Sequence, residues 1–380
     1  MTASQPSSGT GHEPPRSAPA AETAPFLGLR GVSKRLGKTQ ALQGIDLEVG
    51  RNELVVVLGP TGAGKTTLLR TIAGLEQPDA GTIHMAGTDV TATDPALRDV
   101  ALVFQNFSLY PRWSVRKNLE FPLRAPGRSL PEAEIERRVT WAAALLSITR
   151  HLDRDASRLS GGEMQRVAIG RAIVRRPRLF LMDEPLTNLD AKLRETLRVE
   201  LVQLRRELET PMIFVTHDQS EALSMADRIV VLSAGRILQV GAPREIYERP
   251  SSPVVALQLG QPAINLVPVR REAGMWLALD GTPLMRAERS GPAERLLGVR
   301  PEDIAVHGGE ATHAGVVRIV EYIGPTTTLL VDWAGTRLHI LVPRRAPVRP
   351  GDHVHPRIDA SRVVLFEAGD RSPSSRKGVP

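Results

Sequence analysis

Short apolar runs along the chain alternate with longer stretches in which apolar residues recur at helical spacing. The short runs predict strands buried on both faces of a sheet, and they cover residues 53–58, 100–104, 179–182, 212–215 and 228–232. Helical spacing and composition predict helices over residues 65–73, 131–147, 160–174 and 191–208. Strands that alternate with helices in this way predict a mostly parallel α/β sheet.

The regions on either side of this sheet have a different pattern. Residues 26–49 alternate apolar and polar side chains, with turns predicted at Gly37 and Gly44, which indicates antiparallel strands. Beyond Gly241, prolines interrupt the chain and short strands follow, which predicts a small all-β, barrel-like domain. We therefore expect disordered tails over 1–25 and 369–380, an α/β domain over 26–242 with a helical subdomain at about 107–160, and an all-β domain over 243–368.

Composition narrows the class of protein. The chain has 380 residues, 41% hydrophobic and 24% charged, which is typical of a globular protein with room for two domains. The aromatic share of 4% argues against a base-stacking platform, and the lack of cysteine excludes disulfides and thiolate metal sites. The net charge of +7 fits an acidic partner, an anionic membrane surface or an ordinary basic surface. Since no apolar run approaches membrane-spanning length, we expect a cytosolic protein unless another subunit holds it at a membrane.

A glycine-rich loop joins the first buried strand to the first helix. It fills the pattern G-x-x-x-x-G-K-[ST], in which glycines let backbone N–H groups surround a phosphate. Lys65 supplies a charge for the β- and γ-phosphates, and the Thr66 hydroxyl can ligate Mg²⁺. The candidate nucleotide-binding residues are Gly59, Pro60, Thr61, Gly62, Ala63, Gly64, Lys65, Thr66 and Thr67.

An acidic pair ends the strand predicted at 179–182. Asp183 at the end of this buried strand is placed to hold Mg²⁺, directly or through water. Glu184 follows it and is the candidate to orient or deprotonate an attacking water. Downstream of a phosphate loop, this pair predicts hydrolysis of the bound nucleotide.

The run Leu-Ser-Gly-Gly-Glu-Met-Gln-Arg at 159–166 resembles the signature motif of ATP-binding cassette (ABC) transporter ATPases. Ser160, Gly161 and Gly162 stand at a predicted helix N-terminus, which is a favourable place for an anion. In that family this end meets the γ-phosphate bound to a second subunit. The resemblance therefore implies ATP and Mg²⁺ as ligands, and a dimer of two such chains or of this chain with a close paralogue.

Other positions extend the resemblance. Gln105 matches the glutamine that contacts metal and water, and Leu189 and Asp190 match the loop that contacts the opposite subunit. His217 matches the histidine that hydrogen-bonds the γ-phosphate. Leu36 stands where the family usually has an aromatic residue that stacks on adenine, so we expect weaker adenine binding. Glu163 in place of the commoner glutamine is a milder departure.

Four further segments resemble the importer ATPases for sugars and polyols: residues 118–123, 239–250, 260–266 and 298–303. This resemblance implies an ATPase at the cytoplasmic face of a bacterial plasma membrane, bound to two permease subunits and served indirectly by an extracytoplasmic solute-binding protein. It also implies that the C-terminal domain is an OB-like regulatory module. Importers of sulfate, iron and polyamines share much of this layout, so these solutes stay open as alternatives.

Two other classes of function were weighed against the importer. A soluble ABC ATPase acting on nucleic acid or the ribosome would use the β domain as a nucleic-acid-binding barrel, but no basic stripe with interleaved aromatics is present there. A phosphate-loop kinase would leave the 159–166 run and His217 without a role. We therefore expect no nucleic-acid partner.

Overall fold

A six-stranded sheet forms the centre of the ATPase part, in the order β10-β9-β3-β8-β7-β6. All neighbours in it are parallel except β10, which runs antiparallel to β9. Every residue of β3, β7 and β8 is buried, as expected for parallel strands covered on both faces. The strands are β3 Leu54–Leu58, β6 Val100–Val103, β7 Leu179–Asp183, β8 Met212–Thr216, β9 Arg228–Ser233 and β10 Arg236–Gly241.

The computed structural model describes residues 24–125, 130–288, 291–307 and 313–368, so nearly all of both predicted tails lies outside the described residues.

Side chains of β3 alternate between two apolar cores. Val55 and Val57 belong to the core that contains α1 Lys65–Ala73, whereas Leu54 and Val56 belong to the core that contains α4 Gly161–Ile173 and α5 Ala191–Leu208. The sheet therefore lies between two layers. Short α6 Gln219–Met225, which the sequence pattern did not predict, follows β8.

A second, antiparallel sheet has the order β2-β1-β4-β5 and confirms the strands expected before the phosphate loop. Its strands are β1 Leu27–Leu36, β2 Thr39–Val49, β4 Ala80–Met85 and β5 Thr88–Asp89. The turn expected at Gly44 is wrong, because Gly44 lies inside β2 with a φ of 57°. There Val32 pairs with Ile45 and Lys34 with Leu42, so β2 carries an extra residue. Gly44 marks a bulge, the other feature that uses a left-handed glycine.

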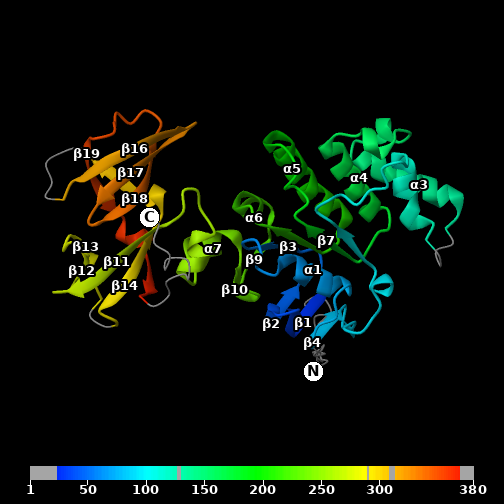
Figure 1. Cartoon of the computed structure of the whole chain (residues 1–380), viewed down its shortest axis with the longest axis horizontal. Helices are drawn as coiled ribbons and strands as arrows, with labels where there is room; N and C mark the ends of the chain where they lie inside the picture. Colours follow the sequence, from blue (N-terminus) through cyan, green and yellow to red (C-terminus); the bar gives the residue numbers. More distant parts are fainter. Residues whose placement is uncertain (1–23, 126–129, 289–290, 308–312, 369–380) are drawn as a thin grey trace, which may run out of the picture.

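Helices α2 Val115–Glu120 and α3 Glu132–Leu145 lie between β6 and α4, with short 3₁₀ turns at Phe121–Leu123, Thr149–His151 and Ala156–Arg158 along this part of the chain; a further 3₁₀ turn at Pro95–Leu97 precedes β6. The buried Asn118 of α2 fixes the segment before it. Its Oδ1 accepts from the backbone N–H of Tyr110 at 2.9 Å, and its Nδ2 donates to the carbonyls of Tyr110 and Ser114, both at 3.1 Å. Figure 1 shows α3 and α4 at the end of the molecule far from the C-terminal β domain.

Two short helices, α7 Pro243–Glu248 and α8 Pro253–Leu257, connect β10 to the β domain (Figure 1). Arg300 of the β domain joins the two parts. Its guanidinium lies 3.9 Å from the ring centroid of Tyr247 in α7 and donates to the carbonyls of Tyr247 and Leu259. Burial lowers the pKa of Arg300, while the nearby charges of Glu302 and Asp303 act in the opposite direction.

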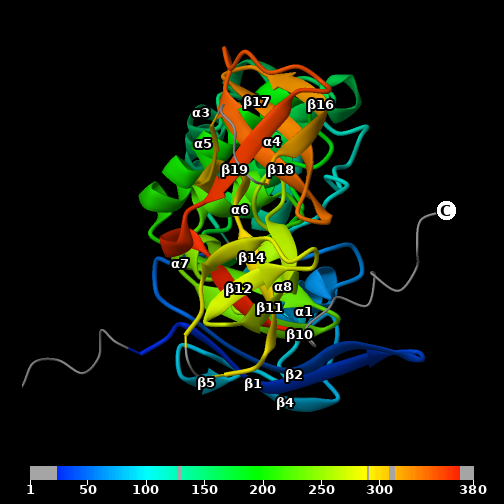
Figure 2. The same cartoon turned by 90° about the vertical axis from the view of Figure 1, so that its left-hand side faces the viewer.

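The β domain contains two five-stranded antiparallel sheets, in the orders β13-β12-β11-β14-β20 and β15-β19-β16-β17-β18. Apolar side chains of both, such as Val267 and Leu329, belong to one core, and Figure 2 shows β16–β19 above β11, β12 and β14. The strands are β11 Asn265–Glu272, β12 Met275–Ala278, β13 Pro283–Arg286, β14 Glu294–Val299, β15 Ile304–His307, β16 Gly315–Ile323, β17 Thr326–Trp333, β18 Thr336–Pro343, β19 His353–Ile358 and β20 Val364–Glu367; 3₁₀ turns cover Pro301–Asp303 and Ala360–Arg362. Within the described ranges, no helix has both the length and the apolar character to cross a membrane.

Candidate functional site

The phosphate loop runs from the end of β3 to α1 and packs tightly on its surroundings. A Cβ on Gly59 would come 2.2 Å from the carbonyl oxygen of Leu232, and one on Gly64 would come 2.4 Å from that of Ala41. Gly64 also has a φ of 102°, a backbone conformation that residues other than glycine rarely adopt. These two glycines are therefore required by the path of the loop, which ends at the N-terminus of α1.

Lys65 and Glu184 form an ion pair beside this loop. The Lys65 side chain is 5% exposed, and its Nζ lies 3.2 Å from Oε1 of Glu184. The same Nζ donates to the carbonyl oxygens of Gly59 at 2.9 Å and Pro60 at 3.1 Å. The cation that the sequence assigned to phosphates is thus held by one carboxylate and two carbonyl oxygens in this structure.

Glu184 also contacts His217 at the end of the neighbouring strand. Oε2 of Glu184 lies 2.9 Å from Nδ1 of His217 and accepts from the Thr187 hydroxyl at 3.3 Å. Glu184 has a φ of 45°, a sparsely populated conformation for a residue with a side chain, of the kind that clusters at functional sites. Because β7 and β8 are adjacent and parallel, their ends deliver both residues to one edge of the sheet.

Thr66 and Asp183 offer two oxygen ligands of the kind that Mg²⁺ prefers. The Thr66 hydroxyl lies 3.1 Å from Oδ1 of Asp183. Asp183 is 8% exposed, and burial raises the pKa of its carboxyl. A divalent cation at this point would compensate for that burial, so the residues present fit the metal that the sequence predicts.

A second buried carboxyl lies behind His217. Oε2 of Glu221 in α6 accepts from the Thr216 hydroxyl at 2.5 Å, and burial raises the pKa of Glu221. Asp218 caps α6 by accepting from the backbone N–H of Ser220 at 2.7 Å. This arrangement fixes the strand end that carries His217, and the sequence analysis missed it because a short helix with one acidic residue gives no motif.

The loop after Glu184 connects the sheet edge to α5. Asp190 caps α5 through the backbone N–H of Leu193 at 3.0 Å. Arg194, which the sequence analysis also missed, donates to the carbonyls of Leu186 and Leu189 and pairs with Asp218 at 3.6 Å. Arg194 therefore ties this loop to the start of α6, next to His217.

Ser160, Gly161 and Gly162 lie at the N-terminus of α4, as predicted. Ser160 is the N-cap and is exposed. A Cβ on Gly162 would come 2.1 Å from Cδ2 of Leu193, whereas one on Gly161 would meet nothing closer than 3.8 Å. Gly162 thus packs on α5, whereas a Cβ on Gly161 would fit at ordinary contact distance from Leu189. Within the described residues, no hydrogen bond or ion pair joins this helix end to the phosphate loop of the same chain.

Among the described residues, no hydrogen bond or ion pair joins the side chain of Gln105 or Leu36 to the group formed by Lys65, Glu184 and His217. The Gln105 side chain is exposed, and its recorded contact is through its backbone carbonyl, which accepts from Nδ2 of Asn188 at 3.1 Å. Leu36 is the last residue of β1 and is 42% exposed. The roles assigned to these two residues, like those of the other candidate site residues, stay predictions.

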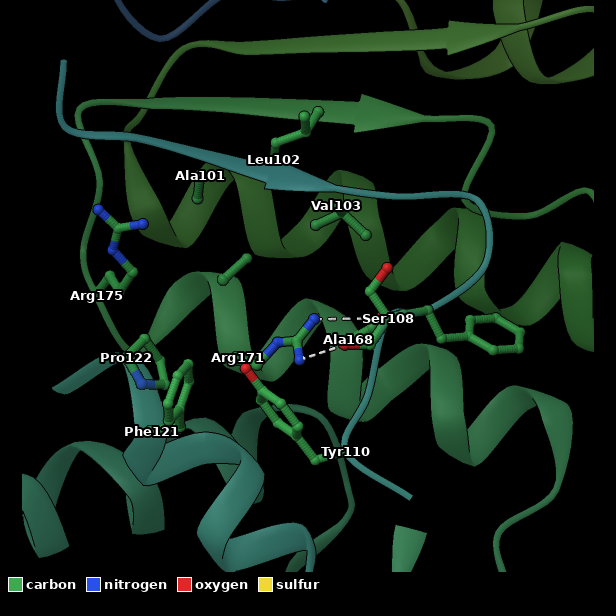
Figure 3. Close-up of a pocket in the computed structure, with 12 residues that line it drawn as sticks. Ala101, Leu102, Val103, Ser108, Tyr110, Phe121, Pro122, Ala168, Arg171 and Arg175 are labelled. Carbon is green, nitrogen blue, oxygen red and sulfur yellow. Dashed lines mark hydrogen bonds between the residues drawn. The ribbon is translucent and has the colours of Figure 1, made fainter. Parts of the chain in front are cut away.

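A groove of about 240 Å³ lies between β6, the start of the helical segment and α4 (Figure 3). Arg171 of α4 reaches across it and donates to the carbonyls of Ser108 at 2.6 Å and Phe107 at 3.2 Å. Both of these residues have positive φ. Tyr110 and Phe121 line the groove and, with Trp113, form an exposed cluster of stacked and edge-on rings.

Comparisons with known proteins identify a family for both parts of the chain. A family model described as "ABC transporter" matches residues 42–187, and one described as "TOBE domain" matches residues 297–366. The sn-glycerol-3-phosphate import ATP-binding protein UgpC of Cupriavidus pinatubonensis is 43% identical over 361 residues, covering 90% of this chain and 97% of that protein. The alpha-glucoside transport ATP-binding protein AglK of Rhizobium meliloti is 43% identical over 359 residues, covering 90% and 98%.

Solved structures show the same ATPase fold. A nucleotide-free ATP-binding cassette from an ABC transporter gives a TM-score of 0.56 at 25% identity, covering 62% of this chain and 98% of that one. CbiO1 from Clostridium perfringens, part of the ABC transporter complex CbiONQ, gives 0.55 at 28% identity, covering 60% and 92%. The family, the fold class and the activity expected from the sequence are confirmed: the chain belongs to the ATP-binding proteins of ABC transporters, and its ATPase domain is followed by a TOBE domain.

Proposed function

We propose that two copies of this chain, or this chain and a close paralogue, close around two Mg-ATP and drive a bacterial importer from the cytoplasmic face of the plasma membrane. The observation that carries the proposal is the separation of two complementary groups: Lys65, Glu184 and His217 at one sheet edge, and the open end of α4 at another place. Since the α4 end has no contact with its own phosphate loop in the described residues, it is available to a partner's nucleotide.

The proposed mechanism follows from the contacts of Glu184. When ATP binds, its phosphates replace Glu184 as the partner of Lys65, which frees Oε1 to orient the attacking water. His217 holds the other carboxylate oxygen, and we assign to it the hydrogen bond to the γ-phosphate. Thr66 and Asp183 would hold Mg²⁺, which neutralises charge on the β- and γ-phosphates when bound.

We place the permease contact at the groove between β6 and α4. Its walls include the exposed rings of Tyr110 and Phe121, and its floor is connected through Phe107 to the strand end that carries Gln105. A groove that combines aromatic rings with polar groups such as Arg171 fits a short amphipathic helix of a membrane subunit. The nearby Arg116 of α2 is engaged with Glu136 at 2.5 Å, so the aromatic rings are the stronger candidates for the permease contact.

We further propose domain limits of 26–242 for the ATPase and 243–368 for the regulatory β domain, with the helical subdomain at about 107–160. For the transported solute we propose sn-glycerol 3-phosphate or an α-glucoside, because similarity to UgpC and AglK extends through the TOBE domain. The solute passes through the permeases, so residues of this chain carry no direct selectivity for it.

Uptake in cells tests this assignment. In a strain that lacks the chain, uptake of radiolabelled sn-glycerol 3-phosphate or maltose should be lost and should return with the wild-type chain. The matched control is Glu184→Gln, which should assemble but restore no uptake. Recovery of uptake of neither solute, or equal recovery with Glu184→Gln, would contradict the proposal.

A further inference from the structure

The backbone just after Gln105 has an unusual conformation. Phe107 has a φ of 58° and Ser108 a φ of 52°, so two successive residues with side chains occupy the left-handed region. Such conformations cost free energy and persist only where neighbouring groups fix them, which happens most often at functional sites. Gln105, to which we assign contact with the metal and the attacking water, lies in the same short segment.

Arg171, in the last turn of α4, fixes this conformation. Its Nη1 donates to the carbonyl oxygen of Ser108 at 2.6 Å, and its Nη2 donates to that of Phe107 at 3.2 Å. Figure 3 shows both hydrogen bonds reaching from the helix to the segment that follows β6. A guanidinium holds its N–H donors in one rigid plane, so it can fix the directions of two successive carbonyls at once.

Other elements hold this segment at its two ends. Nδ2 of Asn188 donates to the carbonyl of Gln105 at 3.1 Å, and Asn118 holds Tyr110 at the far end. Between these points, the hydrogen bonds that reach the segment from another element within the described part of the chain come from Arg171. Without that side chain, the middle of the segment could relax out of the left-handed region.

The charge of Arg171 also needs an explanation. Burial lowers the pKa of its guanidinium, and among the described residues no carboxylate forms an ion pair with it. A partly buried cation without an opposite charge is costly. Because α4 presents Ala168 and Ala172 to the same groove, packing there does not require a long charged side chain. The two carbonyls that it binds account for the cation at this position.

We propose that Arg171 is a positioning residue for ATP hydrolysis that acts through Gln105. By holding the carbonyls of Phe107 and Ser108, it keeps the segment in the backbone path from which the Gln105 side chain reaches the metal and the attacking water. The inference rests on the proposed function, in which Gln105 makes that contact. It adds a residue of α4 that lies outside the 159–166 motif.

The test is a double-mutant cycle between Arg171 and Gln105 on the ATPase activity of the full-length chain. Arg171→Met keeps an unbranched side chain and removes every donor. Because a misplaced group lowers the rate more than the affinity, kcat should fall roughly 10- to 100-fold with KM for ATP nearly unchanged. Gln105→Ala should lower kcat by a similar factor, and adding Arg171→Met to it should lower kcat no further. Equal effects of Arg171→Met in both backgrounds would overturn the proposal.

Two matched variants accompany the cycle. Arg206→Met, at an exposed position of α5, removes the same charge and should leave kcat unchanged. Arg171→Lys keeps the charge but replaces the planar group with one ammonium, so its kcat should lie between those of wild type and Gln105→Ala. It also serves if Arg171→Met fails to fold, and a wild-type kcat in Arg171→Lys would then contradict the proposal.

Hydrogen exchange gives a readout that does not depend on turnover. Arg171→Met should speed amide exchange in residues 105–110 by about tenfold or more, while β6 and α4 keep their wild-type rates. Unchanged exchange in this segment would overturn the proposal. Faster exchange throughout the ATPase domain would also overturn it, because Arg171 would then support the fold as a whole.

Gln105→Ala separates the inference from its basis. If Gln105→Ala lowers kcat and the Arg171 variants do not, only the inference fails. If Gln105→Ala leaves kcat unchanged, the proposed role of Gln105 fails, and the inference fails with it.

Discussion

The phosphate-loop end and the signature end of this ATPase are built in opposite ways. The first gathers side chains from several elements at a buried sheet edge, where the Lys65 and Glu184 side chains are 5% and 16% exposed. The second is the end of one helix, α4, with an exposed serine cap and room for a Cβ at Gly161. An unpaired charge is costly in a buried site, so the charged groups of the first end form ion pairs within the chain. The second end is exposed to solvent and needs no such partner before a ligand binds.

Because the two ends differ in burial and pairing, we expect them to have different roles in ATP binding and hydrolysis. In the mechanism that we propose, ATP exchanges the Lys65–Glu184 ion pair at the phosphate-loop end for a contact between Lys65 and phosphate, so that ATP binding also releases the Glu184 carboxylate. At the signature end nothing has to be broken except the hydroxyl bond from Ser160 to Glu163. Changes at the first end should therefore alter chemistry, and changes at the second should alter affinity and assembly.

The largest effect is expected for Glu184→Gln. The amide cannot accept a proton from water, so kcat should fall by roughly 10²–10⁴-fold. ATP affinity should be kept or increased because the pair that competes for Lys65 is weakened, and an ATP-bound dimer should accumulate in size-exclusion chromatography with light scattering. Glu195→Gln on the exposed face of α5, 74% exposed, is the control. Normal turnover in Glu184→Gln would remove Glu184 from the mechanism.

Asp183→Asn should weaken Mg²⁺ binding and, in the absence of nucleotide, raise the stability of the fold. The apparent affinity for Mg²⁺ should fall about tenfold or more, since one charged ligand is lost. Without nucleotide, however, the variant should melt at a higher temperature at neutral pH, because burial raises the pKa of Asp183 and its ionised form costs stability there.

The raised pKa of Asp183 also predicts how the difference in Tm between Asp183→Asn and wild type changes with pH. A carboxyl with a raised pKa in the folded state binds its proton more tightly there, so ionisation above its unfolded pKa, about 3.9, destabilises the fold. The difference in Tm between Asp183→Asn and wild type should therefore shrink as the pH falls toward about 4. A difference that is constant with pH, or that grows in acid, contradicts this account.

Gly162→Ala and Gly161→Ala test the signature end. A Cβ on Gly162 would overlap Leu193, so this variant should lose about 1–3 kcal/mol of stability in chemical denaturation. Leu193→Ala in the same chain should recover most of it. Gly161→Ala has space, with Leu189 at an ordinary contact distance, and should fold normally. It should still weaken the ATP-bound dimer, because the added methyl lies at the helix end that we propose to contact the partner's nucleotide. If the two glycine variants behave alike, the two faces of this helix end are not distinct.

Much of the fold could be predicted because strong local signals agree. Helices α1 and α5 have the predicted bounds, since a glycine loop precedes the first and a long amphipathic repeat defines the second. Short helices α2 and α6 were missed because six or seven residues carry too few turns to show a period. Gly44 was misread because glycine marks a left-handed φ and does not say whether the chain then reverses.

The sequence motifs identified candidate site residues but did not predict the contacts between them. Lys65, Glu184 and His217 were all candidates, but their ion pair and hydrogen bond depend on which strand ends are adjacent. The order of the strands in the sheet sets that adjacency. Arg194 was missed for a related reason. It acts on its neighbours through tertiary packing, and a single basic residue on a helix is ordinarily a surface residue.

The smallest effect is expected for Leu36→Tyr, which tests whether the base is held by the phosphate-loop end alone. Leu36 ends β1 and is 42% exposed, so a ring at this position has room to lie on adenine. Stacking of aromatic pairs adds on the order of 1 kcal/mol, so ATP should bind about fivefold tighter, with a smaller gain for GTP, in titrations with fluorescent nucleotide. Leu279→Tyr, at an exposed position of the β domain, should change neither affinity. Unchanged affinity and base preference in Leu36→Tyr would mean that the nucleotide base does not lie against the end of β1, and that the phosphates alone fix the ligand.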